Sequence, residues 1–102
     1  MNTSNAFGLS DSDLNKIIEI IRNTTEVKCG KIFGSRAKGN YRNGSDIDIA
    51  VEAPALDHTQ YLRLCTKLDD LMLPYKIDLV LIHRIDNPSL VDHIQRIGVP
   101  LW

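Results

Sequence analysis

The sequence predicts an α/β domain: a small mixed β-sheet of three or four strands with helices packed on one face. Three short β-type segments alternate with three segments that carry apolar residues at helical spacing. A length of 102 residues suffices for one hydrophobic core but not for two. We therefore expect a single domain over residues 10–102, preceded by a flexible segment over residues 1–9.

The composition, with 43% hydrophobic and 25% charged residues, is typical of a globular protein in water. The formal net charge of −1 argues against a surface that binds nucleic acid directly. No apolar run reaches the length of a membrane span, and no signal peptide is visible. Cys29 and Cys65 lack metal-binding spacing and are interpreted as reduced core residues. These features favour a cytoplasmic protein.

The first helix is expected to begin after the polar run 10–13, which offers several N-cap side chains. Apolar residues between positions 14 and 21 follow at helical spacing, so the helix should end near Asn23. Leu9, which precedes the cap, is placed to pack against the first turn.

The first strand is expected over residues 27–33, and it leads directly into a Gly-Ser step. Gly34 permits a sharp turn and a close approach of the backbone to a ligand. Ser35 is a suitable N-cap for a short helix that Gly39 would end. Because the first turn of a helix presents free N–H groups, this step predicts an anion-binding site.

Basic side chains are concentrated around this turn. Five of the twelve Lys and Arg residues of the chain lie between positions 28 and 42. Such a local concentration suits a phosphate group better than it suits a long polyanion.

Two aspartates lie one residue apart in the second predicted strand, which follows the turn signal Asn43-Gly44. The segment 46–51 alternates polar and apolar residues, so Asp46 and Asp48 share one strand face, about 6.6 Å apart at Cα. Carboxylates held this close repel each other, and a divalent cation removes the repulsion. Mg²⁺ usually takes one or two carboxylates plus substrate phosphates. The stretch therefore predicts a site for a metal-bound nucleoside triphosphate.

The segment 57–72 is the second predicted helix, and Pro54 ends the strand region before it. Its apolar stripe is wider than packing on one sheet face requires. Burial is one explanation of this width, and a surface for a partner protein is the other. The stripe comprises Tyr61, Leu62, Leu64, Cys65, Leu68, Leu71 and Met72.

The third strand is expected over residues 75–82. Asp78 interrupts its apolar centre, where a lone carboxylate is unfavourable to bury. A salt bridge with Lys76 would explain Asp78; the alternative is that it joins the two aspartates of the preceding strand. As a third acid it would bind metal or accept the proton of an attacking hydroxyl, and the sequence leaves both roles open.

Asn87-Pro88 begins the third helix, with an N-cap followed by proline at the first helical position, and Gly98 should end it. Trp102 is expected to cover the core rather than to contact a partner. No two histidines have zinc spacing, so all three are interpreted as ordinary surface or rim residues. These are His58, His83 and His93.

The motif Gly34-Ser35, ten residues, Asp46-x-Asp48 resembles the signature of the DNA polymerase β-like nucleotidyltransferase superfamily. The segment FGSRAKG…SDIDIAVE and the short chain length are similar to those of its smallest members, the minimal nucleotidyltransferases (MNT domain). This resemblance covers most of the chain. The resemblance implies a HEPN-type helical partner, and in some members an antitoxin that transfers AMP from ATP onto a partner tyrosine. A carboxylate on the next strand completes the acid triad in that family, which here would be Asp78.

We therefore expect a nucleotidyltransferase with ATP as substrate, in which Asp46, Asp48 and Asp78 are catalytic and hold two Mg²⁺ ions. Little chain remains to form an acceptor pocket, so a partner protein should supply that pocket, either as the substrate itself or by holding a small substrate. Two alternatives remain: a non-catalytic antitoxin that neutralises its partner by contact, and the catalytic subunit of a two-chain small-molecule nucleotidyltransferase. A kinase is disfavoured because the Walker motif GxxxxGK[ST] is absent. The residues expected to bind the nucleotide are Gly34, Ser35, Arg36, Lys38 and Arg42.

Overall fold

The computed structural model describes residues 7–102 and confirms the predicted α/β architecture with a mixed sheet. The elements are α1 Asp11–Arg22, β1 Cys29–Phe33, α2 Gly34–Lys38, β2 Ile47–Glu52, α3 His58–Asp69, β3 Ile77–Leu81, the 3₁₀ turn η1 Ile82–Arg84, α4 Pro88–Ile97 and β4 Val99–Pro100. Within this part of the chain no helix has both the length and the apolar character that a membrane span requires.

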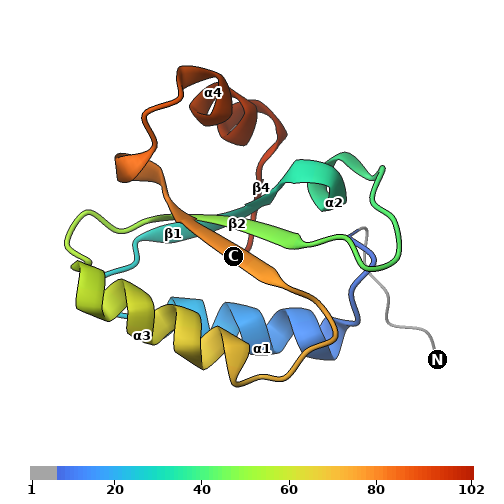
Figure 1. Cartoon of the computed structure of the whole chain (residues 1–102), viewed down its shortest axis with the longest axis horizontal. Helices are drawn as coiled ribbons and strands as arrows, with labels where there is room; N and C mark the ends of the chain where they lie inside the picture. Colours follow the sequence, from blue (N-terminus) through green and yellow to red (C-terminus); the bar gives the residue numbers. More distant parts are fainter. Residues whose placement is uncertain (1–6) are drawn as a thin grey trace.

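The four strands form one sheet in the order β3-β2-β1-β4 (Figure 1). β1 is antiparallel to both β2 and β4, whereas β2 and β3 are parallel. In this register Asp48 of β2 lies opposite Phe33 of β1 on one side and opposite Asp78 of β3 on the other. The end of β1, and the Gly-Ser step that follows it, therefore lies beside the two strands that carry carboxylates.

Helices cover both faces of the sheet. α1 and α3 lie side by side on one face, and α2 and α4 lie on the other (Figure 1). The prediction that the helices pack on one face is therefore wrong, because α4 buries its apolar side against the opposite face of the sheet. Ile47 and Ile49 of β2 are fully buried in the core on the α1 and α3 face. Ala50 faces the other way and packs with Phe33 and Ile94 in a second, smaller core under α4. The alternation of β2 side chains thus decides that Asp48 points to the α2 and α4 face.

The first helix begins and ends where the sequence predicted. The Ser10 hydroxyl accepts a hydrogen bond from the Asp13 N–H at 3.1 Å, and Asn23 is the C-cap. Leu9 is fully buried, so the packed part of the chain begins before the helix and overlaps the segment that was expected to be flexible. The remainder of that segment, residues 1–6, lies outside the described residues.

α3 begins at a capping box, because Asp57 accepts from the Gln60 N–H at 2.8 Å while Gln60 accepts from the Asp57 N–H at 2.9 Å. It ends at Asp69, three residues before the predicted end. Met72 then adopts a left-handed φ of 55° and is 85% exposed, and Leu62 is 49% exposed. The wide apolar stripe is therefore only partly explained by burial.

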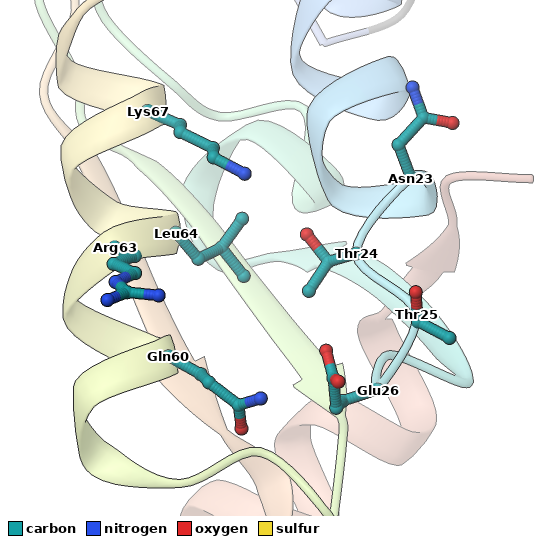
Figure 2. A pocket seen from close by; sticks show the side chains of 8 residues that line it. All are labelled: Asn23, Thr24, Thr25, Glu26, Gln60, Arg63, Leu64 and Lys67. Carbon is teal, nitrogen blue, oxygen red and sulfur yellow. The ribbon is translucent and has the colours of Figure 1, made fainter.

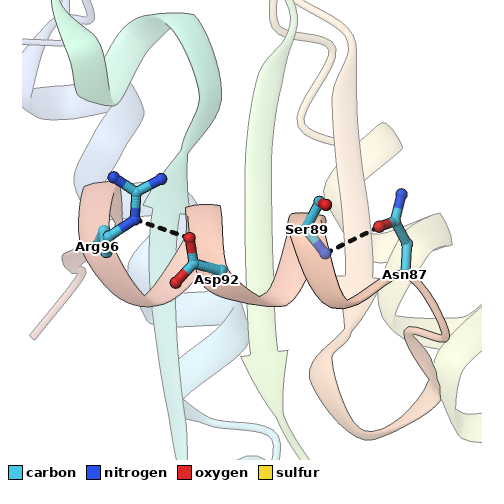
Figure 3. A network of polar contacts seen from close by, with 4 residues as sticks. All are labelled: Asn87, Ser89, Asp92 and Arg96. Carbon is cyan, nitrogen blue, oxygen red and sulfur yellow. Dashed lines mark hydrogen bonds and ion pairs between the residues drawn. The ribbon is translucent and has the colours of Figure 1, made fainter.

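α4 begins at the predicted cap, since the Asn87 side chain accepts from the Ser89 N–H at 2.9 Å and Pro88 occupies the first helical position. On its exposed face Arg96 and Asp92 form an ion pair at 2.8 Å (Figure 3). Exposed pairs one helical turn apart contribute little to stability. The hydrophilic face of α4 is thus turned to solvent, and its other face packs on the sheet.

The chain end forms a fourth strand, whose position was not predicted from the sequence. β4 pairs with β1, and the Leu101 N–H donates to the Gly30 carbonyl at 2.9 Å. Leu101 is buried, whereas Trp102 remains 39% exposed near Gly30. Leu101 rather than Trp102 therefore closes the core at this edge.

Tyr61 joins α3 to the outer edge of β3, because its hydroxyl donates to the Leu79 carbonyl at 2.7 Å. Replacing Tyr61 with Phe removes this bond and leaves the carbonyl without that donor. We expect the free energy of unfolding to fall by about 0.5–1.5 kcal/mol. Denaturant titration at pH 8 of wild type and Tyr61→Phe tests this; equal midpoints would contradict it.

The same bond predicts a pH dependence. Burial, followed by the contact with the Cys65 side chain, raises the pKa of Tyr61 from its ordinary value of 10.0 to about 12. Because the pKa is higher in the folded chain, the contribution is complete below pH 10 and is lost as the pH rises through 12. The stability difference between wild type and Tyr61→Phe should therefore shrink between pH 10 and pH 12.

Candidate active site

Three aspartates lie near the N-terminal ends of β2 and β3. Asp48 and Asp78 occupy registered positions on these parallel strands, where Cα atoms of neighbouring strands are about 4.8 Å apart. Asp46 lies just before β2, two residues ahead of Asp48. Asp48 is half-buried, whereas Asp46 and Asp78 are exposed. The structure therefore brings the predicted acids to one end of the sheet.

The electrostatics link these acids. Burial contributes most to raising the pKa of Asp48, and the negative charges of Asp78 and Asp46 raise it further; His93 acts in the opposite direction. The surroundings of Asp48 thus disfavour its ionised form. A cation bound beside it would offset both the burial and the repulsion.

The fit to Mg²⁺ depends on the donor set. In residues 7–102 no group of three or more His, Cys, Asp or Glu side chains is arranged to hold a metal ion by itself. Mg²⁺ usually binds one or two carboxylates plus substrate phosphates, and the registered pair Asp48 and Asp78, with Asp46 beside it, offers such oxygens. The acids therefore fit Mg²⁺ as one part of a site that a phosphate-bearing substrate would complete.

Asp78 is exposed, so its carboxylate does not incur the free-energy cost of burial that its place among apolar residues predicted. Asp78 alternates along β3 with the buried Leu79, so it points away from the core on the α1 and α3 face. Among the described residues it forms no ion pair with Lys76, because the only pair within 4.0 Å there lies on α4. No Lys or Arg side chain of the described residues therefore forms an ion pair with Asp78, and its carboxylate is accessible from solvent.

The Gly-Ser turn packs directly on Asp48. Gly34 has a φ of +72°, and a Cβ at this position would collide with the Asp48 carboxylate. Phe33, not Ser35, is the N-cap of α2, and its own side chain makes no capping hydrogen bond. The prediction for Ser35 as the cap is wrong because the helix begins two residues earlier, at Gly34. The predicted end at Gly39 is confirmed, with a left-handed φ of 87°.

Arg36 is buried within the fold, whereas the sequence predicted that it would bind the nucleotide. Only 2% of it is exposed, and Nη1 donates to the Phe7 carbonyl at 2.7 Å, while Nε and Nη2 donate to the Ser45 carbonyl at 3.2 and 2.9 Å. Its guanidinium lies 5.1 Å from the Tyr41 ring centre and 4.8 Å from that of Tyr75. Arg36 therefore holds the loop before β2 against the chain instead of facing a ligand.

Lys38 and Arg42 remain as the basic residues near the turn. Both are exposed, and neither forms an ion pair with the described residues. The backbone N–H of Arg42 donates to the Ser45 hydroxyl at 2.8 Å, which orders the loop that carries it. Their charged ends are thus available to an anion.

His93 belongs to this site, and the interpretation as an ordinary surface or rim residue is wrong for it. Its Nε2 accepts from the Gly34 N–H at 3.3 Å, and its ring meets Phe33 edge-on, with centroids 6.0 Å apart at 77°. The sequence carried a signal, because His93 lies three residues after Leu90 and four before Ile97, on the inward face of α4. The other two histidines are exposed, as expected.

A polar cavity of about 240 Å³ lies elsewhere, between the end of α1 and the side of α3 (Figure 2). Glu26, Arg63 and Lys67 are among its lining residues. It lies on the α1 and α3 side of the sheet, away from the face to which Asp48 points. It also contains a single carboxylate, so it does not match the predicted metal site.

The glycine–serine turn packs on one of two registered carboxylates of a mixed sheet, which agrees with the nucleotidyltransferase class that the sequence resemblance implied. Residues 15–102 match the family described as polymerase beta, nucleotidyltransferase. The chain belongs to this family, which confirms the fold and the class of enzyme that the resemblance implied.

Individual relatives agree with this assignment. "Putative protein adenylyltransferase MJ0128" of Methanocaldococcus jannaschii is 37% identical over 83 residues, which cover 80% of this chain and 84% of the relative. A chain in the crystal structure of a toxin–antitoxin with AMP-PNP has a TM-score of 0.73 and 32% identity, covering 87% of this chain and 72% of that chain. A chain in the structure of a tri-AMPylated Shewanella oneidensis HEPN toxin in complex with MNT antitoxin has a TM-score of 0.67 and 29% identity, covering 89% and 70%.

Proposed function

We propose that the protein is an Mg²⁺-dependent adenylyltransferase that moves AMP from ATP to a tyrosine hydroxyl of a HEPN-type partner. The main observation behind this proposal is that Gly34 packs on the Asp48 carboxylate and that Asp78 lies in register beside Asp48. The chain also belongs to the nucleotidyltransferase family. Similarity to a protein adenylyltransferase and to a complex with a tri-AMPylated HEPN toxin supports the acceptor. The biological role that follows is that of the antitoxin in a cytoplasmic toxin–antitoxin pair.

The acids are proposed as the metal ligands. Asp46, Asp48 and Asp78 would hold Mg²⁺, as two ions. The cation supplies positive charge against the triphosphate and the leaving pyrophosphate. Asp48 is central to this proposal, because its carboxylate packs on Gly34 and its pKa responds to the charges of both other acids.

The phosphate contacts are proposed for the turn and its basic neighbours. The Ser35 hydroxyl and the backbone at Gly34 would bind the distal phosphates, while Lys38 and Arg42 supply positive charge. Arg36 is left out of this set, because its guanidinium is used within the fold.

The reaction is a substitution at the α-phosphorus of ATP. The tyrosine oxygen of the partner forms a bond to that phosphorus as the bond from it to the bridging oxygen of pyrophosphate breaks, and pyrophosphate leaves with the electron pair. Asp78 accepts the proton of the attacking hydroxyl. Its exposed position on an edge strand suits this role, because a protein acceptor can reach it from solvent.

Labelled ATP tests the proposal. The purified complex with the partner is incubated with Mg²⁺ and ATP labelled at either the α or the γ phosphate. We expect label on the partner from the α position only. Label from the γ position would indicate a kinase. No label, with partner binding that survives Asp46→Asn and Asp48→Asn, would instead indicate a non-catalytic antitoxin.

Gly34→Ala is expected to lower the rate of AMP transfer by about 100-fold, because displacing reacting groups by about 1 Å has effects of this size. The added Cβ meets the Asp48 carboxylate, and the positive φ of Gly34 adds backbone strain. The rate is measured from α-labelled ATP.

Gly39→Ala is the matched control, since Gly39, the C-cap of the same helix, has a φ of +87° but nothing within 4 Å of an added Cβ. Both variants should lose about 1 kcal/mol of stability from the left-handed backbone. Only Gly34→Ala should lose activity, and equal losses of activity would show that contact with Asp48 is unimportant.

A further inference from the structure

The Gly-Ser turn obtains one of its supports from a distant part of the chain. The Gly34 N–H donates to Nε2 of His93, which lies 59 residues away on α4. The N-cap residue of α2, Phe33, offers no side-chain hydrogen bond to the helix end. His93 is therefore the side chain that fixes the first N–H of the turn.

His93 is itself held in place. Its ring packs edge-on against Phe33, which is buried, and the next residue, Ile94, is buried in the core under α4. α4 contacts both α2 and β1. The acceptor that meets Gly34 is thus presented by a packed helix and is not a mobile surface group.

This support matters because of what Gly34 touches. Glycine can adopt many backbone conformations, so the peptide plane at the turn depends on its partners for its orientation. The same residue packs on the Asp48 carboxylate and precedes Ser35. A rotation at Gly34 would move the phosphate-binding backbone relative to the acid that is proposed to hold the metal.

We propose that His93 is a positioning residue for nucleotidyl transfer, which keeps the Gly-Ser turn aligned with Asp48 by accepting the Gly34 N–H. This inference rests on the proposed function. Nε2 must be the unprotonated ring nitrogen to accept this bond. His93 does not touch the reacting atoms in this account and acts through the turn.

Three variants separate the hydrogen bond from the packing. His93→Phe keeps an aromatic ring against Phe33 but removes the acceptor. His93→Gln carries an amide at about the reach of Nε2, so it can restore the acceptor, whereas His93→Asn is too short to reach it. His83→Phe, at an exposed histidine of η1, is the control for the general loss of a histidine.

We expect His93→Phe and His93→Asn to lower kcat/KM for ATP by about 10-fold to 100-fold, through a weaker affinity for ATP as well as a lower kcat, because the turn that binds the triphosphate is misaligned. His93→Gln should stay within about 3-fold of wild type, a loss far below that misalignment effect. His83→Phe should be unchanged. Melting temperature and partner binding are measured for each variant to verify that the chain is folded.

Two results would overturn the inference. If His93→Phe retains the wild-type rate, the ring serves packing alone. If His93→Gln is as impaired as His93→Asn, the imidazole has another role, and this pair decides the question even where the Phe variant does not fold. If wild type transfers no label, the proposed function is wrong, but the role of His93 can still be tested. The ATP affinities of His93→Gln and His93→Asn are then measured by calorimetry, and equal affinities would contradict that role.

Discussion

Asp48→Asn is expected to reduce AMP transfer by at least about 1,000-fold while the chain remains folded and bound to its partner. The substitution keeps the shape of the side chain but removes the negative charge in the centre of the acid cluster. Loss of a single electrostatic contact to a transition state is worth about 100-fold to 1,000-fold, and here binding of the cation is weakened as well. The rate is measured with α-labelled ATP and the purified partner.

Stability should change in the opposite direction. Burial and the charges of Asp78 and Asp46 raise the pKa of Asp48, so its charged form is less favourable in the folded chain than in the unfolded chain. Removing that charge should leave the melting temperature at pH 7 equal or higher. Functional sites commonly trade stability for activity in this way.

Asp86→Asn provides the matched control, because it removes an exposed carboxylate between η1 and α4 with the same change in net charge. Its transfer rate should equal that of wild type. A rate for Asp48→Asn within 10-fold of wild type would refute the proposed metal ligands. An Asp48→Asn protein that neutralises the toxin in cells as well as wild type does would point to inhibition by contact.

Arg36→Met is expected to be the most destabilising single substitution at the turn, with a loss of about 3 kcal/mol in the free energy of unfolding. Hydrogen bonds to a charged group contribute about 1.5–3 kcal/mol each, and carbonyls left without a donor add to the loss. Methionine keeps the apolar stem but not the donors to the Phe7 and Ser45 carbonyls. It also removes the cation between Tyr41 and Tyr75. Urea titration at pH 7 measures the effect.

Lys38→Met on the same helix is the control. Lys38 is exposed and forms no ion pair with the described residues, so its stability should change by less than about 0.5 kcal/mol. The apparent affinity for ATP should respond in the reverse order, falling for Lys38→Met and staying near wild type for the folded fraction of Arg36→Met. Equal stabilities of the two variants would contradict the structural role of Arg36.

Local features of this chain could be predicted because they depend on neighbouring residues. The caps at Ser10 and Asn87, the end of α2 at Gly39 and the turn at Gly44 follow from side-chain chemistry and backbone freedom over three or four residues. The spacing of Asp46 and Asp48 on an extended segment is likewise fixed by strand geometry. These features predicted the fold class and the position of the acids.

Other features could not be predicted because they depend on which distant segments pack together. Arg36 and Lys38 are similar in sequence terms, and only the meeting of Arg36 with Phe7, Tyr41 and Tyr75 makes it an interior residue. The exposure of Asp78 likewise depends on which face of β3 is covered, because its neighbour Leu79 is buried on the α1 and α3 face and Asp78 points to the other face.

The sequence by itself determined the Gly-Ser step, the two aspartates after it and most helix boundaries, because covalent spacing and local propensity set them. Tertiary structure decided that Asp78 lies in register with Asp48, that Arg36 is buried, and that His93 reaches Gly34 from 59 residues away. The physical reason is that strand register and helix placement are set by burying the apolar faces of the whole chain at once. No short segment contains that information.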